Sequence, residues 1–268
     1  MKECKDLLDA VNRRTYASAE VVDWYDHLDF IHKPESVILQ KLTPLIKDRK
    51  ILDLGIGGGR TTRFLLEISK DYTGIDYTPA CVGVVRRKYP EANALCGDAR
   101  DLSAFEEADF EFVLFSFNGI DYVDHQDRLK VFREIRRVLK PGGFFVFSTH
   151  NRDYRQFNKL PWQGDVHFNL NVLKNSLYTL AYLPKHLRLK KHETHTDEYA
   201  IINDNAHGFS LFTYYIGLQQ QKAQLQRAGF LNVEAYDMDG EMVEREQDFP
   251  WTYYLTQKPV DTELAPGV

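Results

Sequence analysis

The chain has 268 residues, enough for one large α/β domain or two small ones with a sizeable core. Its 34 basic residues against 39 acidic ones give a net charge of -5, which argues against general nucleic-acid binding and against attachment to an anionic membrane surface. Apolar residues at 43% and charged residues at 27% are ordinary globular values and exclude collagen-like, low-complexity and wholly disordered chains.

The cysteines and the N-terminus indicate a reducing compartment. Cys4, Cys81 and Cys96 form no C-x-x-C pair, and an odd count favours free thiols over a disulfide framework. The first residues mix charges where a signal peptide would be apolar, and no segment approaches the ~20 apolar residues that span a bilayer. We therefore expect a cytoplasmic protein without membrane association.

Residues 1–48 are predicted to be helical and to cap one side of a sheet. Apolar residues recur at intervals of three to four in residues 17–25 and again in residues 35–42, after Pro34. This segment is the first of the expected domain divisions.

From Lys50 onward, short apolar runs alternate with helical patterns. Strands are expected at residues 51–54, 72–76, 92–96, 110–115, 144–148, 232–236 and 251–256, and helices at residues 126–139 and 218–228. Such alternation is typical of βαβ units. We predict a Rossmann-like three-layer αβα fold with a seven-stranded, mostly parallel sheet over residues 49–260.

An insertion of residues 150–216 interrupts this pattern and is too long for an ordinary connection. Residues 166–183 look helical, and two β-rich runs, residues 198–202 and 209–216, flank a turn at residues 203–208. We expect a hairpin that serves as a substrate lid or as a dimer arm, the latter making a homodimer. Residues 261–268 show no periodicity and are expected to form a flexible tail.

A glycine-rich turn directly after the first strand, Asp53 to Thr62, marks a ligand site. Glycine lets a ligand approach the backbone at a helix N-terminus. A dinucleotide fingerprint would need Gly or Ala at position 60, where Arg60 stands, and no Gly-Lys-Ser/Thr closes the turn as a P-loop would. A nicotinamide oxidoreductase is therefore disfavoured.

The remaining pattern resembles the class I S-adenosylmethionine-dependent methyltransferases. The acid-x-Gly-x-Gly-x-Gly motif is matched at Asp53, Gly55, Gly57 and Gly59, and Asp76 ends the second strand. Further landmarks follow in order at residues 97–100, 115–118 and 136–143. The resemblance covers roughly residues 48–260 without the insertion, and it implies S-adenosylmethionine as cofactor.

The resemblance assigns cofactor contacts to positions in this chain. Asp76 is expected to accept hydrogen bonds from both ribose hydroxyls. The turn of Gly55, Gly57 and Gly59 would pass under the methionine part. Asp53 is expected to hold the turn or to meet the ammonium, and Arg60 or Thr61 to meet the carboxylate. Asp98 and Ala99 are expected to contact the adenine, with Tyr77 against its face. The remaining expected contacts are the fourth motif, Ser116, Phe117 and Asn118, and Tyr25 as an aromatic neighbour of the sulfonium.

Candidate catalytic residues follow the fourth and fifth strands, whose carboxyl ends face a ligand in this fold. His150, after the fifth strand, is the first candidate for a general base, and His207 in the predicted turn is the second. Asp121, after the fourth strand, is a further candidate. Tyr122, Asn151, Tyr214 and Tyr215 are expected to contact the substrate. The alternatives are a loop hydrogen-bonding role for His150, a helix cap for Asp121 and core packing for the tyrosines.

Taken together, these features predict an enzyme that transfers a methyl group from S-adenosylmethionine to an oxygen or nitrogen atom of a small-molecule acceptor. No metal site is expected. One alternative is a non-catalytic S-adenosylmethionine sensor or scaffold. Another is an RNA-directed methyltransferase using the basic run at residues 185–192. No Asn-Pro-Pro-aromatic tetrad follows the fourth strand, where Ser116 to Gly119 stands, so nucleic acid is the weaker expectation.

Overall fold

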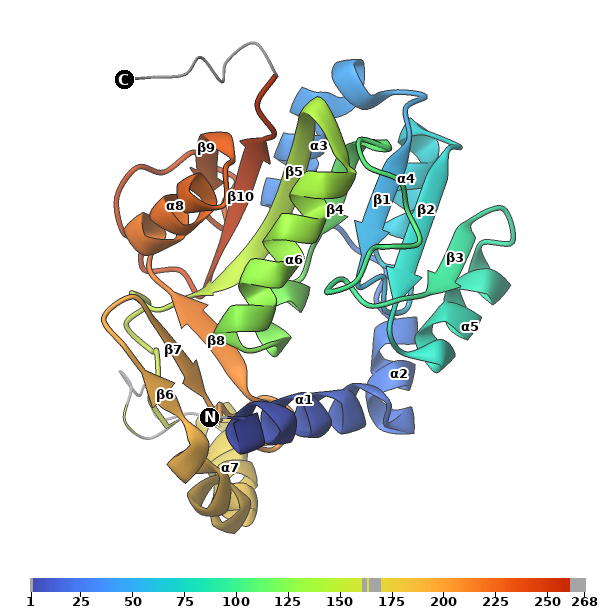
Figure 1. Cartoon of the computed structure of the whole chain (residues 1–268). Helices are drawn as coiled ribbons and strands as arrows, with labels where there is room; N and C mark the ends of the chain where they lie inside the picture. The colour runs from blue at the N-terminus through green and yellow to red at the C-terminus, as the bar shows by residue number, and fades with distance from the viewer. Residues whose placement is uncertain (1, 161–162, 164–169, 261–268) are drawn as a thin grey trace.

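The computed structural model describes residues 2–160, 163 and 170–260, and its centre is the predicted αβα sandwich (Figure 1). Five parallel strands stand in the order β3-β2-β1-β4-β5. The core continues as β5-β10-β9, in which β10 is antiparallel to both of its neighbours. The strands are β1 (Ile51–Leu54), β2 (Tyr72–Asp76), β3 (Asn93–Cys96), β4 (Phe110–Phe115), β5 (Leu139–Asn151), β9 (Leu231–Tyr236) and β10 (Trp251–Gln257). The seven-stranded core is thus confirmed.

The insertion adds three strands to this core, so the described sheet has ten. They are β6 (Thr194–His195), β7 (Tyr199–Ile202) and β8 (Thr213–Ile216). β7 and β8 are antiparallel neighbours, and β8 runs parallel to the end of β5, with His150 opposite Tyr215. The connection between β7 and β8 is wider than the predicted turn, because the Asn203 side chain donates to the carbonyl oxygens of Phe209 and Leu211 and holds a longer loop.

Helices cover both faces of the core sheet. One face carries α3 (Lys33–Ile46), α4 (Thr62–Ile68) and α5 (Pro79–Lys88), and the other carries α6 (His125–Val138) and α8 (Leu218–Arg227). Strand β4 shows the cause: Phe112 and Leu114 face the first group of helices, and Val113 and Phe115 face the second. Successive strand residues point to opposite faces, so an unbroken apolar strand needs cover on both.

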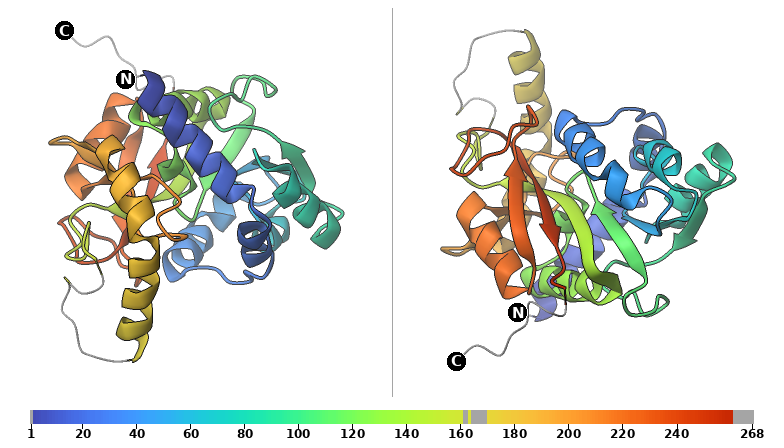
Figure 2. Two further views of the ribbon diagram at one scale, coloured as in Figure 1. Left: turned by 90° about the horizontal axis from the view of Figure 1, so that it is seen from below. Right: turned by 90° about the horizontal axis from the view of Figure 1, so that it is seen from above.

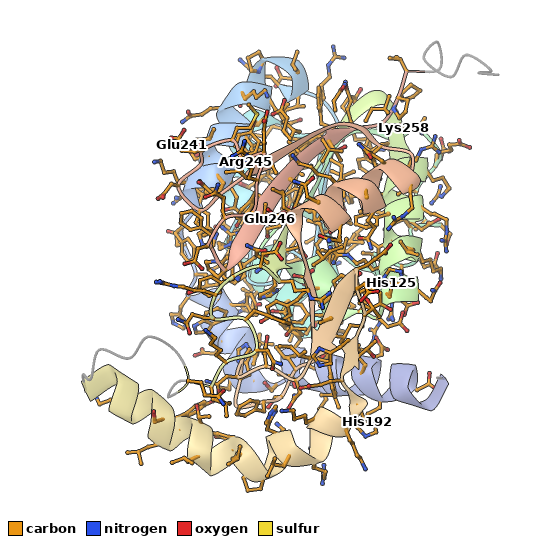
Figure 3. All side chains as sticks on the ribbon, turned by 90° about the vertical axis from the view of Figure 1, so that its left-hand side faces the viewer. His125, His192, Glu241, Arg245, Glu246 and Lys258 are labelled. Atoms are coloured by element: carbon orange, nitrogen blue, oxygen red, sulfur yellow. The ribbon has the colours of Figure 1, made fainter. Side chains whose placement is uncertain are left out.

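Two helical segments lie across the end of the sheet toward which β1 and β2 point (Figures 1 and 2). The first comprises α1 (Lys2–Tyr16) and α2 (Ala19–Asp26), and the second is α7 (Leu170–Leu189), which is followed by the short helix η2 (Lys190–His192). Figure 3 shows His192 at this end and Lys258 toward the other. Leu8 of α1 and Leu189 of α7 share an apolar cluster with β7 and β8, which anchors both segments.

Two sequence-based expectations extend beyond the described residues. The predicted helix at 166–183 corresponds to α7 from Leu170 onward, and residues 166–169 lie outside the described part of the chain. The predicted tail at 261–268 lies outside it as well. Among the helices that the structure describes, none has the length and apolar character needed to cross a lipid bilayer.

Candidate functional site

The glycine-rich turn lies between β1 and α4, where its backbone needs conformations and clearances that side chains oppose. Gly57 has a φ of +52°, in the left-handed region. A Cβ on Gly58 would lie 2.2 Å from the carbonyl oxygen of Tyr25, so α2 packs directly on the turn. Any larger residue at position 58 would push α2 away from the site.

Asp76 ends β2 and faces this turn. Its Oδ2 accepts a hydrogen bond from the amide of Gly57 at 2.9 Å, and its Oδ1 accepts one from the amide of Thr78 at 2.8 Å. The side chain is buried, and this burial raises its pKa. Each carboxylate oxygen retains a lone pair, so the group can accept two further hydrogen bonds from a diol.

A cavity opens beside Asp76 and encloses about 810 Å³ of space, its mouth included. Most of the predicted cofactor contacts line it, and so does one of the predicted substrate contacts: Tyr25, Gly55, Gly57, Asp76, Tyr77, Asp98, Ala99, Ser116, Phe117 and Tyr122. Tyr16 of α1, which the sequence analysis did not single out, forms part of the same wall.

Asp53 and Thr61 lie behind the turn and do not line the cavity. Asp53 Oδ2 accepts hydrogen bonds from the hydroxyls of Thr61 at 2.9 Å and Tyr72 at 3.0 Å. Burial raises the pKa of Asp53 to about 7, although both hydroxyls act in the opposite direction. These bonds are consistent with the expectation that Asp53 holds the turn. Gly59, at the α4 end of the turn, has a positive φ of 85°.

Arg60 is engaged by a partner that the sequence analysis missed. Its guanidinium donates to both carboxylate oxygens of the buried Glu35 of α3, at 2.6 and 2.7 Å, and to the Ser116 hydroxyl at 2.9 Å. These bonds direct Arg60 away from the place where a cofactor carboxylate was expected to meet it. Glu35 carries no motif, and only the folded contact between α3 and the turn identifies it.

Asp98 is bound by two arginines at the rim of the cavity. Burial opposes its ionisation, yet hydrogen bonds from Arg100 and Arg13 outweigh this effect and lower its pKa to about 2. Arg13 belongs to α1, and its guanidinium carbon lies 4.6 Å from the ring centre of Tyr77. Helix α1 therefore covers the side of the cavity where an adenine was expected.

Comparisons with known proteins agree with this geometry. Residues 51–143 match the family model described as a methyltransferase domain. This part of the chain is similar to the class I S-adenosylmethionine-dependent methyltransferases. The resemblance inferred from the motifs is thereby confirmed, and S-adenosylmethionine is the cofactor of this family.

Two curated relatives show the extent of the sequence similarity. A probable S-adenosylmethionine-dependent methyltransferase of Mycolicibacterium smegmatis is 31% identical over 116 residues, which are 43% of this chain and 44% of that protein. A ubiquinone biosynthesis O-methyltransferase of Cereibacter sphaeroides is 34% identical over 114 residues, 40% of this chain and 44% of that protein. The chain thus spans less than half the length of these relatives.

Solved structures extend the similarity of fold to most of the chain. An S-adenosylmethionine-dependent methyltransferase from Clostridium acetobutylicum has a TM-score of 0.59 at 18% identity, covering 90% of this chain and 98% of that one. A Burkholderia thailandensis 1,6-didemethyltoxoflavin-N1-methyltransferase, solved with its substrate and S-adenosylhomocysteine, has a TM-score of 0.52 at 13% identity, covering 85% and 78%. At these identities the similarity concerns the fold alone.

The fold brings His150, near the end of β5, into direct contact with Asp121, which lies in the short helix η1 (Gly119–Tyr122) after β4. Asp121 Oδ2 accepts hydrogen bonds from His150 Nδ1 and from its backbone amide, both at 2.7 Å. Asp121 Oδ1 accepts from Arg128 and from Thr149, both at 2.6 Å. Asp121 is fully buried and saturated, so it can orient His150 but has no access to a substrate.

Seven aromatic side chains form a closed circuit of ring contacts around this end of the sheet. Consecutive ring centres lie 4.9 to 6.5 Å apart. In order, the members of the circuit are Tyr16, Tyr122, His150, Trp251, Phe117, Trp24 and His207. The circuit unites two of the three predicted catalytic residues with the wall of the cofactor cavity.

Two members of the fourth motif have unusual backbones. Phe117 and Asn118 both have positive φ, at 54° and 58°, and such strain in non-glycine residues clusters at functional sites. The Asn118 amide donates to Ser148 Oγ at 2.8 Å, while its side-chain Oδ1 is buried with no hydrogen-bond partner among the described residues. Asn118 does not line the cavity, and the Phe117 ring does.

The remaining predicted substrate contacts diverge. Tyr215 lies 5.0 Å from the His150 ring, centre to centre, and its hydroxyl donates to Asp204. Tyr214 is instead packed in the apolar cluster under β8, where its ring faces the Arg128 guanidinium at 4.5 Å. Asn151 donates to the carbonyl oxygens of Gln247 and Phe249, so it fastens a loop. The alternation of strand residues explains why neighbours at 214 and 215 differ.

Proposed function

We propose that this protein transfers a methyl group from S-adenosylmethionine to an oxygen or nitrogen of a small-molecule acceptor. The observation that carries the proposal is the Asp76 carboxylate, held by two backbone amides beside the glycine turn, with free lone pairs facing the cavity. Charge-assisted hydrogen bonds to a ribose diol would contribute about 1.5–3 kcal/mol each. The cofactor supplies a methyl group on a positively charged sulfur.

The cavity wall supports placement of such a cofactor. Tyr77 lies next to Asp76 and, like Ala99, faces the cavity where the base would extend from the ribose. Tyr16, Tyr25 and Phe117 line the same cavity, and aromatic faces attract a sulfonium by about 0.5–2 kcal/mol. The chain thus offers separate surfaces for the nucleoside and the charged sulfur.

His150 is our candidate for the general base. Because its Nδ1–H donates to Asp121, the Nε2 atom keeps the lone pair and can accept a proton. Bound S-adenosylmethionine would supply the methyl group and keep the electron pair of the broken carbon–sulfur bond, and His150 Nε2 would take the proton that the acceptor oxygen or nitrogen loses. His207, on the opposite side of the aromatic circuit, is the second candidate.

The enclosure of the site supports a small acceptor. Helix α1 contributes Tyr16 to the wall of the cavity and is fixed by Asn12, which donates to the carbonyl oxygens of Tyr122 and Phe212. The aromatic circuit adjoins this wall through Tyr16, Tyr122 and Phe117. A folded RNA or protein acceptor would need an open groove, whereas a metabolite fits inside such a chamber.

The test is transfer of labelled methyl groups from S-adenosylmethionine into a metabolite extract. We expect a labelled small product together with S-adenosylhomocysteine, and a loss of at least 100-fold in rate for His150→Gln, since general bases contribute about 10²–10⁴-fold. Cofactor binding without S-adenosylhomocysteine release in any extract would favour a sensor. Label in RNA rather than in small molecules would overturn the proposed acceptor class.

A further inference from the structure

A second cavity lies beside the cofactor cavity, between α1 and α7, and encloses about 1190 Å³ with its mouth included. Figure 2 shows these two helices side by side when the molecule is viewed from below. His207 lines this cavity, and its ring lies 6.5 Å from that of Tyr16, which lines the cofactor cavity. The Tyr16 and His207 rings therefore separate the two spaces.

Positive charge converges on this second cavity from two elements distant in sequence. Arg14 comes from α1, and Lys185 and Arg188 come from α7. The cavity has one carboxylate in its wall, that of Glu20. Among the described residues, no ion pair joins any of these three basic side chains to an acid. The lining of this cavity thus carries a local excess of positive charge, whereas the whole chain has a net charge of -5.

The surroundings of Lys185 show that the basic groups oppose one another. Its amine donates to the hydroxyl of Ser210, a neutral partner. Burial first, and then the charges of Arg14 and Arg188, lower the pKa of Lys185. An anion in the cavity would relieve this repulsion, and it would take hydrogen bonds from three charged donors.

We propose that this second cavity binds an anionic group of the methyl acceptor, a phosphate or a carboxylate, through Arg14, Lys185 and Arg188. The proposal rests on the proposed function and adds the substrate class. The body of the acceptor would pass His207 and enter the aromatic circuit, so that its nucleophilic atom meets the methyl group. The anionic site would then set the orientation of the acceptor, and the histidines would receive its proton.

The first experiment measures binding of inorganic phosphate and of acetate by calorimetry at constant ionic strength. The test variant is Lys185→Ala/Arg188→Ala, and the matched control is Lys190→Ala/Lys191→Ala, which removes the same charge from exposed positions outside the cavity. We expect the wild type and the control to bind at least one of the two anions, and the test variant to bind at least tenfold more weakly. Equal affinities in all three proteins, or no binding to the wild type, would overturn the proposal.

The second experiment identifies the source of the anion in a labelled metabolite extract. Loss of methyl incorporation after treatment with alkaline phosphatase would indicate a phosphate, and a phosphatase-resistant product retained on an anion-exchange column would indicate a carboxylate. A labelled product that carries no negative charge would overturn the proposal.

Calorimetry with S-adenosylmethionine separates this proposal from the proposed function. The test variant should bind the cofactor as the wild type does, which also shows that it is folded. Anion binding without cofactor binding in the wild type would contradict the proposed function alone. Cofactor binding without anion binding would contradict only the second site.

Discussion

At the scale of single residues, the carboxylate of Asp76 connects the sequence motif to the chemistry. Two backbone amides fix its orientation before any ligand arrives, so little conformational freedom remains to be lost on binding. The alanine variant would remove both acceptors of the expected ribose contacts. It would also leave the amide of Gly57 without its partner.

We predict that Asp76→Ala weakens S-adenosylmethionine binding about tenfold or more, because at least one charge-assisted hydrogen bond of ~1.5–3 kcal/mol is lost. Isothermal calorimetry measures this directly. The matched control is Asp71→Ala, which removes an exposed carboxylate just before the same strand. An unchanged dissociation constant for Asp76→Ala would exclude a ribose-binding role.

Asp53 gives a pH-dependent prediction. Its pKa of about 7 in the folded protein lies above the ordinary value near 3.9, so the folded state binds more protons than the unfolded state between about pH 4 and 7. The contribution of Asp53 to the free energy of unfolding is therefore present below pH 4 and is lost as the pH rises toward 7. Asp53→Asn lacks this titration.

We expect the stability advantage of the wild type over Asp53→Asn to shrink as the pH rises from about 4 to about 7, measured by urea denaturation at each pH. The exposed Asp71→Asn variant should follow the wild-type profile. Parallel profiles for wild type and Asp53→Asn would show that the buried carboxyl does not titrate in this range.

Residue types at motif positions were predictable, but their partners were not. Asp76 and the glycines were found because their spacing reflects a local strand–turn–helix unit. The Glu35 partner of Arg60 and the Arg13 partner of Asp98 come from the N-terminal helices, which meet the site only in the folded chain. Sequence spacing carries no information on such long-range pairs.

At the scale of elements, α1 has a role that its sequence alone does not indicate. The helix covers both cavities, with Tyr16 in the wall of one and Arg14 in the wall of the other. Its buried Asn12 donates to the carbonyl oxygens of Tyr122 and Phe212 at 2.9 Å and accepts from the Phe212 amide at 2.8 Å. One side chain thus fixes α1 to two segments of the site.

We predict that Asn12→Ala loosens α1, because it leaves buried backbone groups without partners at a cost of about 1–3 kcal/mol. Hydrogen exchange followed by mass spectrometry should show amides of α1 exchanging at least about fivefold faster, with α3 unchanged. Asp6→Ala, an exposed change on the same helix, is the control. Equal protection of α1 in both variants would contradict this anchoring role.

The elements themselves were largely predictable. The helical N-terminus, the seven core strands and the helices before β5 and β9 follow from periodicity and from glycine and proline at their ends. The extension of the sheet by β8, β7 and β6 was not expected, since β8 pairs with only the last two residues of β5. A two-residue pairing across an insertion leaves no pattern in the sequence.

At the scale of the whole molecule, the two cavities and the aromatic circuit lie at one end of the sheet. In open α/β sheets, ligands bind at this end, where the parallel strands have their carboxyl ends. The core sheet supplies most of the cavity beside Asp76, while the N-terminal helices and the insertion line the second cavity, where we propose that the acceptor binds. This division explains why the sequence motifs pointed to the cofactor and why the second cavity was found only in the structure.

A crystal structure of the protein with S-adenosylhomocysteine would test the proposed role of Asp76 directly. We predict both ribose hydroxyls within hydrogen-bond distance of the Asp76 carboxylate, the amino-acid end over the turn of Gly55 to Gly59, and the sulfur directed toward the aromatic circuit. A ligand bound elsewhere, or crystals that take up none at saturating concentration, would contradict it.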